Sequence, residues 1–335
     1  MSDVEVITAR EVPLGGPRAM TVRRTLPQRQ RSLIGAWCFV DHYGPDDVAA
    51  TGGMDVPPHP HTGLQTVSWL FTGEIQHRDT VGVVATVRPG ELNLMTAGHG
   101  VAHSEVSTPG TTTLHGVQLW VALPPEARDV PRAFDHHVPE PVHVDGTTVR
   151  VMLGTLAGAT SPLTTYSPLL GAELVLPAAA TVTLDVDPTH EHGLLVDTGD
   201  AVRLEGTPVE RAQIGYLPPG RDRLTITNDA DSPARAMLLG GTPYEHDLVM
   251  WWNFVGGSHE DIVAAREAWE AGSDRFGQVQ GYAGPTQRLP APPMPGVRLR
   301  PRVLHPAATD ASAWGLTPQR CTMMSLPGPS GRSKP

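Results

Sequence analysis

Short apolar runs separated by turn residues dominate residues 57–105. The runs are the segments 66–71, 83–87 and 92–95. Gly73, Gly82 and the pair Pro89-Gly90 divide them. Strand-length runs at near-regular spacing are typical of an antiparallel sandwich or a small barrel. This part of the chain is therefore predicted to be all-β.

A second series of short strands begins near residue 164 and repeats the order of the first. Its predicted strands are residues 172–176, 180–184, 193–196 and 223–227. Both series contain a His-x-His motif, a turn glycine and a Pro-Gly pair in the same order, which is a weak internal repeat. The pattern predicts two related β-barrels, residues 1–125 and 126–285, joined near Pro124-Pro125.

One amphipathic helix and a proline-rich segment follow the second series. Ser258 is a predicted N-cap with Asp261 completing a capping box, and the helix is expected over residues 259–271. Its apolar face consists of Ile262, Ala265 and Trp269. From residue 286 prolines accumulate and hydrophobic periodicity ends, so residues 286–335 are predicted to form a disordered tail.

Four candidate metal ligands stand at the two ends of the segment 57–105. His59 and His61 are two residues apart, as are His103 and Glu105. Side chains at this spacing point to the same face of a strand, so the two pairs can converge inside a barrel. Three imidazoles and a carboxylate suit iron, copper, nickel or zinc, and they leave coordination positions open for water or substrate.

Two other polar pairs lie near these candidates. His77 and Asp79 also share a face; they could orient a ligand histidine, line the mouth of the site, or form a polar strand end facing water. Asp41 and His42 stand at a predicted strand end beside a turn. A turn-capping aspartate and a surface histidine are the favoured interpretation of that pair.

The second series has its own pair, His190 and His192, but no partner pair. After Pro219-Gly220, the segment 224–228 holds neither histidine nor glutamate. Two histidines alone bind a divalent ion poorly, so both are interpreted as structural or surface residues.

Composition excludes several classes of function. A net charge of −10 argues against general nucleic-acid affinity, which requires neutralisation of phosphates. Cys38 and Cys321 are too few for a disulfide framework or a thiolate metal site. Lys334 is the only lysine, which argues against Schiff-base chemistry and a P-loop. With no apolar stretch of about 20 residues and no signal-like N-terminus, a cytoplasmic protein without membrane contact is expected.

An ordered string of motifs resembles the pirin family of the cupin superfamily, over about residues 5–285. The matching motifs are His59-Pro60-His61-Thr62-Gly63, Thr66-Val67, His77-Arg78-Asp79, Pro89-Gly90, Met95-Thr96-Ala97-Gly98, Gly100, His103-Ser104-Glu105 and Gln118-Leu119-Trp120-Val121, with Phe39-Val40-Asp41-His42-Tyr43-Gly44-Pro45 upstream and Trp252-Asn253-Phe254-Val255 downstream. A lone His-x-His is weak evidence, whereas this ordered set is specific.

The resemblance implies a bicupin whose N-terminal barrel holds one metal, typically Fe²⁺, and whose C-terminal barrel holds none. The family's ligands fall on His59, His61, His103 and Glu105. One position departs from the pattern: many cupins carry glutamate four residues after the second histidine, where this chain has Gln65. Loss of a nearby anion would alter the charge around the metal.

The resemblance also implies two alternative functions, and a third interpretation gives the metal no catalytic or regulatory role. The first is an oxidoreductase, an iron-dependent dioxygenase that acts on flavonols with O₂ (quercetin 2,3-dioxygenase, or quercetinase, type), with Glu105 as the catalytic group that accepts the substrate proton. The second is a metal-dependent regulatory protein that acts through protein partners. The third is a cupin whose metal is vestigial or structural.

Overall fold

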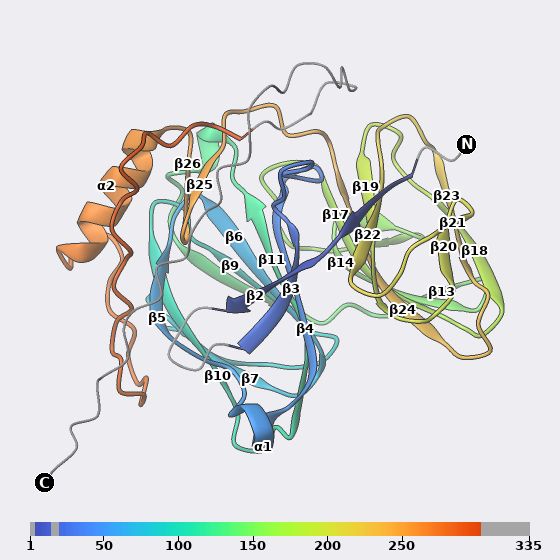
Figure 1. Ribbon diagram of the computed structural model, residues 1–335, viewed down its shortest axis with the longest axis horizontal. Coiled ribbons are helices and arrows are strands. Elements are labelled where there is room, and N and C mark those ends of the chain that lie inside the picture. The colour runs from blue at the N-terminus through green and yellow to red at the C-terminus, as the bar shows by residue number, and fades with distance from the viewer. Residues whose placement is uncertain (1–3, 15–19, 303–335) are drawn as a thin grey trace, which may run out of the picture. The chain divides into compact units, whose positions relative to one another are not determined.

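The N-terminal barrel consists of two antiparallel sheets (Figure 1). A computed structural model describes residues 4–14 and 20–302. The seven-stranded sheet has the order β12 (Ala133–His137), β9 (Leu92–Thr96), β6 (Leu64–Thr72), β11 (Thr113–Ala122), β4 (Trp37–Asp47), β3 (Met20–Leu26) and β2 (Arg10–Leu14). The four-stranded sheet has the order β5 (Asp55–His61), β10 (Val101–Ser107), β7 (Ile75–Asp79) and β8 (Val84–Val87).

The C-terminal barrel repeats this plan. Its seven-stranded sheet has the order β1 (Glu5–Thr8), β22 (Gln213–Leu217), β19 (Glu191–Thr198), β24 (Ala234–Gly241), β17 (Leu169–Leu176), β14 (Thr147–Leu153) and β13 (Val142–Val144). Its four-stranded sheet has the order β18 (Ala180–Asp185), β23 (Arg223–Asn228), β20 (Val202–Leu204) and β21 (Thr207–Pro208). The predicted all-β fold of two related barrels is confirmed.

Short elements connect and cover the barrels. They are α1 (Val48–Thr51), the 3₁₀ turn η1 (Pro125–Ala127), and the hairpins β15 (Thr155–Leu156) with β16 (Ala159–Thr160) and β25 (Val249–Trp251) with β26 (Phe254–Gly256). Strand pairing links the barrels in both directions: β1, at the start of the chain, pairs with β22, and β12, after Pro125, pairs with β9. The division at residue 125 stays a prediction.

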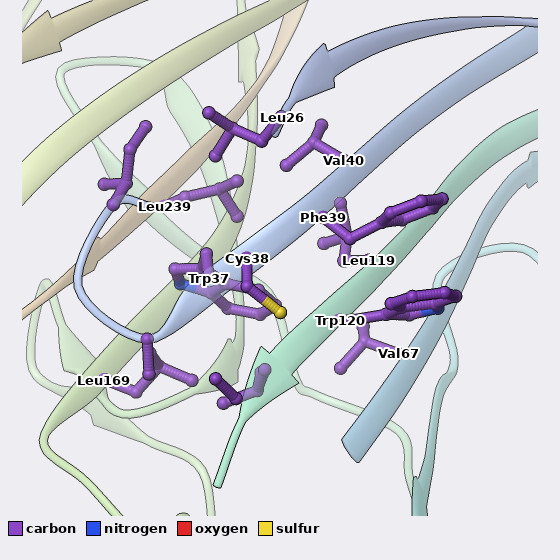
Figure 2. Packing of buried hydrophobic residues seen from close by; sticks show 14 of the residues in the cluster. Leu26, Trp37, Cys38, Phe39, Val40, Val67, Leu119, Trp120, Leu169 and Leu239 are labelled. Atoms are coloured by element: carbon purple, nitrogen blue, oxygen red, sulfur yellow. The ribbon is translucent and has the colours of Figure 1, made fainter. Parts of the chain in front are cut away.

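A hydrophobic core shared by both barrels joins them. Trp37 from β4 is fully buried, and its indole N–H donates to the carbonyl of Leu170 in β17 at 2.9 Å. Figure 2 shows Trp37 between Leu169 and Leu239 of the C-terminal barrel and the N-terminal residues around Cys38. Burial of a tryptophan in this way contributes a large apolar area and fixes its polar atom. The interface therefore resembles a domain core.

The predicted helix forms as α2 (His259–Glu270). The Ser258 hydroxyl accepts from the Asp261 N–H at 3.2 Å, and the Asp261 carboxylate accepts from the Ser258 N–H at 2.9 Å. This reciprocal pair is the predicted capping box. The predicted apolar face is buried against Phe254 of β26 and Ala102 of β10, so the helix packs on the N-terminal barrel.

The prediction of a disordered tail from residue 286 needs a correction. Residues 286–302 contain no helix or strand, but they pack on the fold. The Leu289 N–H donates to the Pro58 carbonyl of β5 at 2.8 Å, and the Trp269 indole donates to the Leu289 carbonyl at 2.8 Å. Proline prevents a strand ladder here without preventing anchored packing. Residues 303–335, including Cys321 and Lys334, lie outside the described residues. Within residues 4–14 and 20–302, no helix is long and apolar enough to span a bilayer.

Candidate metal centre

Strands β5 and β10 place three histidines on one face of the N-terminal barrel. The strands pair antiparallel, with His59 opposite His103 and Val101 opposite His61. Because side chains alternate along a strand, the three imidazoles project to the same side. Their relative exposure is 6%, 1% and 1% in the order His59, His61 and His103. One ring nitrogen of each lies within 4.8 Å of the others, so the structure brings together three of the four predicted ligands.

The geometry and charge of these imidazoles fit a divalent metal. Nε2 of His61 lies 3.0 Å from Nε2 of His103. Two ligand nitrogens at right angles, each about 2.1 Å from a metal, stand about 3.0 Å apart. Burial is the main reason that the pKa of each histidine is lowered, that of His59 to about 4. The imidazoles are therefore neutral near pH 7, the form that binds metals.

Hydrogen bonds indicate which ring nitrogen is free in two of the three histidines, His59 and His103. The Pro57 carbonyl can only accept, so His59 Nδ1, 2.9 Å away, is protonated and Nε2 keeps its lone pair. His77 Nε2 lies 2.9 Å from the Asp79 carboxylate and donates to it, which leaves His77 Nδ1 as an acceptor. His103 Nδ1, 3.4 Å from that acceptor, then carries its proton, and His103 Nε2 faces the site unprotonated.

The Asp79 carboxylate anchors this chain of hydrogen bonds. Its second oxygen accepts from the backbone N–H groups of the next turn, at 2.8 Å from Val81 and 3.1 Å from both Gly82 and Val83. His77 and Asp79 are each 3% exposed. The interpretation of this pair as a polar strand end facing water is therefore wrong. Asp79 and His77 instead orient His103, a candidate ligand.

Glu105 lies beside the three histidines but does not join them as a fourth neighbour. Its carboxylate groups with His77 and His103 instead of with His59 and His61. A register shift between His103 and Glu105 in the pairing of β10 with β5 accompanies this offset. Burial raises the pKa of Glu105, against the opposing effects of the neighbouring His77 and of a hydrogen bond from the Ser68 hydroxyl at 3.2 Å. Its role as a ligand stays a prediction.

Gln65 does not face the site. On β6 it pairs with Thr96 of β9 and Val121 of β11. The cavity-lining residues of β11 are the alternate ones, Gln118 and Trp120. Alternation therefore puts Gln65 on the opposite face, where its amide donates to the Thr96 hydroxyl at 2.9 Å. Gln65 therefore does not line the cavity, and its effect on the charge around the metal stays a prediction.

The three histidines and Glu105 line a cavity of about 380 Å³. One wall holds Phe39 and Trp120, whose rings stack at 4.0 Å between centroids (Figure 2). Segments distant in sequence complete it. They are the β25–β26 hairpin, with Met250, Trp251, Trp252 and Asn253, and the C-terminal segment, with Leu289 and Arg302. Sequence reasoning connected only Trp252-Asn253 with the family and did not assign either segment to the site.

Comparisons with known proteins agree with this architecture. Residues 19–121 match the Pirin family model, and residues 171–277 match the model of the Pirin C-terminal cupin domain. A Pseudomonas aeruginosa protein provisionally named quercetin 2,3-dioxygenase is 48% identical over 290 residues, which is 86% of this chain and 90% of that protein. The chain belongs to the pirin family.

Two solved structures extend the comparison of this pirin. A quercetin 2,3-dioxygenase from Acinetobacter baumannii superposes with a TM-score of 0.82 at 35% identity, over 88% of this chain and 97% of that chain. A bacterial pirin from Escherichia coli in complex with nickel(II) gives a TM-score of 0.55 at 17% identity, over 72% of this chain and 100% of that chain. The latter supports the fold alone.

A second buried cluster joins the two barrels of this pirin. Asp197 of β19 lies with one oxygen 2.7 Å from His42 Nε2 and 2.5 Å from His115 Nε2, while Arg235 reaches its other oxygen at 3.3 Å. His42 and Asp41 are both fully buried, so the predicted surface histidine and turn cap are wrong. Their strand, β4, lies inside the sheet between β11 and β3. Arg235 supplies the charge that balances Asp197, so we interpret the cluster as an ion-pair network.

The histidine pair of the C-terminal barrel lies inside it. His192 is fully buried and His190 is 9% exposed, so a surface location is wrong for His192 and the structural interpretation holds. His192 shares its strand face with Leu194 and Val196 of that barrel's core. Neither ring nitrogen of His192 has a partner among the described protein atoms.

Replacing His192 with leucine is expected to raise the free energy of unfolding at pH 7 by about 1–3 kcal/mol, because it removes unsatisfied buried polar atoms. Burial lowers the pKa of His192 to about 4, below the unfolded value of 6.5. The unfolded chain therefore binds the proton first, and stability falls as the pH drops from 6.5 towards 4. Urea unfolding at pH 7 and pH 5 should show a smaller pH dependence in the variant. The exposed His143 provides the matched control, His143→Leu; an unchanged pH dependence in His192→Leu would contradict this account.

Proposed function

We propose that this pirin is an iron-dependent dioxygenase acting on flavonols of the quercetin type with O₂. The observation that carries the proposal is the convergence of three neutral, buried imidazoles on one aromatic-walled cavity. The name of the Pseudomonas aeruginosa relative and the name of the Acinetobacter baumannii structure support it. An Escherichia coli pirin of the same fold is described in complex with nickel(II), a divalent metal.

The residues divide into ligands, a base and walls. His59, His61 and His103 would hold iron through Nε2, with Glu105 as the fourth ligand. Iron in this position would serve as Lewis acid and template for the enolate oxygen of the substrate. Glu105 accepts the proton of the substrate hydroxyl, because it is the carboxylate that lines the cavity beside His103. A cavity of about 380 Å³ falls within the range of about 300–1,000 Å³ that binds small organic molecules.

The test is iron loading under anaerobic conditions, followed by metal analysis and measurement of oxygen consumption with quercetin. We expect about one equivalent of iron in the native protein and weaker iron binding in Glu105→Gln, with turnover per bound iron about 100-fold or more slower in the variant. His103→Ala should lose the metal. His190→Ala, in the C-terminal barrel, is the matched control and should keep both metal and activity. Native protein that holds iron yet consumes oxygen no faster than Glu105→Gln would reject the proposal.

The regulatory alternative stays a prediction, as do the cytoplasmic location and the absence of nucleic-acid binding. A protein partner would be recognised by copurification, and its loss in a His59→Ala, His61→Ala double variant would connect it to the metal.

A further inference from the structure

The cavity that holds the histidines carries an excess of positive charge. Arg10, Arg24 and Arg302 all line it. Arg24 is balanced, because it forms two hydrogen bonds with the Asp41 carboxylate, at 2.6 and 2.7 Å. Its guanidinium also stands over the Phe39 ring, 4.2 Å from the centroid. Arg24 therefore forms part of the cavity wall, and the Asp41 carboxylate neutralises its charge.

Arg302 and Arg10 have no such counter-ion. Within residues 4–14 and 20–302, neither forms an ion pair with a carboxylate. Arg302 is partly buried, and its Nε is buried without a hydrogen-bond partner. Arg10 donates to the Pro27 carbonyl at 3.3 Å and stays exposed. Desolvation is the main reason that the pKa of Arg302 is lowered; Cys38 opposes this shift, and the charge of Arg10 adds to it. A partly buried guanidinium without an ion pair among the described residues, such as that of Arg302, would be stabilised by an anion that a ligand supplies, and Arg10 adds a second positive charge to the same cavity.

The position of these arginines relative to the histidines gives the cavity a polarity. The histidines are nearly inaccessible and mark its floor, whereas the exposed Arg10 marks its mouth. The chain as a whole carries a net charge of −10, so the positive charge at the cavity entrance is local. Such a local charge would attract small anions to the cavity. Trp120 and Phe39, stacked 4.0 Å apart, provide an aromatic wall along the cavity.

We propose that this site also accepts, beside flavonols, a planar aromatic anion: a hydroxylated aromatic carboxylate whose hydroxyl points to the histidine floor and whose carboxylate binds Arg302 and Arg10. The inference rests on the proposed function for the identity of the site, and it extends that function by adding a second, negatively charged substrate class. Guanidinium groups suit this role, because their planar donors bind carboxylates in a bidentate manner. Arg302 and Arg10 are thus specificity-determining residues.

The experiment compares a matched pair of rigid probes, 6-hydroxy-2-naphthoate and its neutral amide, 6-hydroxy-2-naphthamide. Binding to the iron-loaded protein is measured by calorimetry without oxygen, so that no turnover contributes. The native protein should bind the carboxylate about tenfold or more tightly than the amide, as charge-assisted hydrogen bonds imply. Added salt should weaken binding of the carboxylate and leave that of the amide unchanged.

Variants assign this preference to residues. Arg302→Gln and Arg10→Gln should each reduce the preference for the carboxylate, while the affinity for the amide changes by less than about twofold; Arg302→Lys should keep part of it. The charge-matched control is Arg223→Gln, which removes an exposed arginine of the C-terminal barrel. This variant should keep the full preference for the carboxylate over the amide. Equal affinity of the native protein for both probes, or an unchanged preference in Arg302→Gln, would overturn the inference. Failure of quercetin turnover with the charge preference intact would reject only the proposed function.

Discussion

Replacing Asp197 with alanine is expected to lower the free energy of unfolding by about 3–5 kcal/mol at pH 7. Asp197 is fully buried between the barrels and contacts His42, His115 and Arg235. Without the carboxylate, His42 and His115 lose their acceptor in a buried place, and Arg235, which is partly exposed and also pairs with Glu173, loses one of its two partners. Burial by itself would raise the pKa of Asp197, but hydrogen bonds from His115 and His42 hold it well below its usual range. The stabilisation is therefore complete above the unfolded pKa of about 3.8 and is lost as the pH falls further.

Urea unfolding of Asp197→Ala measures this effect, and Asp185→Ala provides the control. Asp185 pairs with Arg223 on the surface, where the side chains are 83% and 68% exposed. Its loss should change stability by less than about 1 kcal/mol. Since His42, His115 and Asp197 could also hold a metal, the native protein is unfolded with and without a chelator. The cluster would be a metal site instead of an ion-pair network if two results came together. The chelator would lower the free energy of unfolding of the native protein by as much as Asp197→Ala does, and it would not change that of Asp197→Ala.

The predictions that held depend on short-range periodicity. His59 and His61 lie within β5, and His103 lies within β10, so alternation along single strands was enough to place each imidazole. The same reasoning could not be extended to Gln65. Strand β5 ends at His61 and β6 begins at Leu64, so the spacing from His61 to Gln65 crosses a turn and carries no information about the face. The face of Gln65 is set by its pairing with β9 and β11.

The predictions that failed depend on contacts between distant residues. His42 and Asp197 are 155 positions apart, and nothing near His42 in the sequence indicates a buried partner. The pattern around residue 42 therefore resembled an exposed strand end. The prediction of disorder for residues 286–302 failed for a related reason. Their composition predicts a lack of strands, but it cannot show the isolated hydrogen bond that attaches Leu289 to Pro58. The position of Arg302 in the cavity could not be predicted from the sequence for the same reason.

Replacing Asp79 with asparagine is expected to weaken metal binding about 10–100-fold, as loss of a residue that orients a ligand histidine usually does. Asp79 determines the tautomer of His77, and His77 determines that of His103. A neutral amide can accept or donate, so His77 Nε2 no longer has to carry the proton. His103 can then hold its proton on Nε2, where it blocks the lone pair that a metal requires. The charged acceptor of the Val81, Gly82 and Val83 N–H groups is lost as well.

Competition with a chelator of known affinity measures the change in Asp79→Asn. The matched control is Asp187→Asn, because Asp187 stands beside His190 in the C-terminal barrel at 3.7 Å, and its metal affinity should equal that of the native protein. Thermal unfolding of the metal-free proteins separates loss of affinity from loss of folding. An Asp79→Asn protein that folds normally and binds metal within about threefold of native would show that His103 is oriented by its strand alone. A loss of affinity in Asp79→Asn that His77→Gln reproduces would instead assign the orientation to the Asp79–His77–His103 chain.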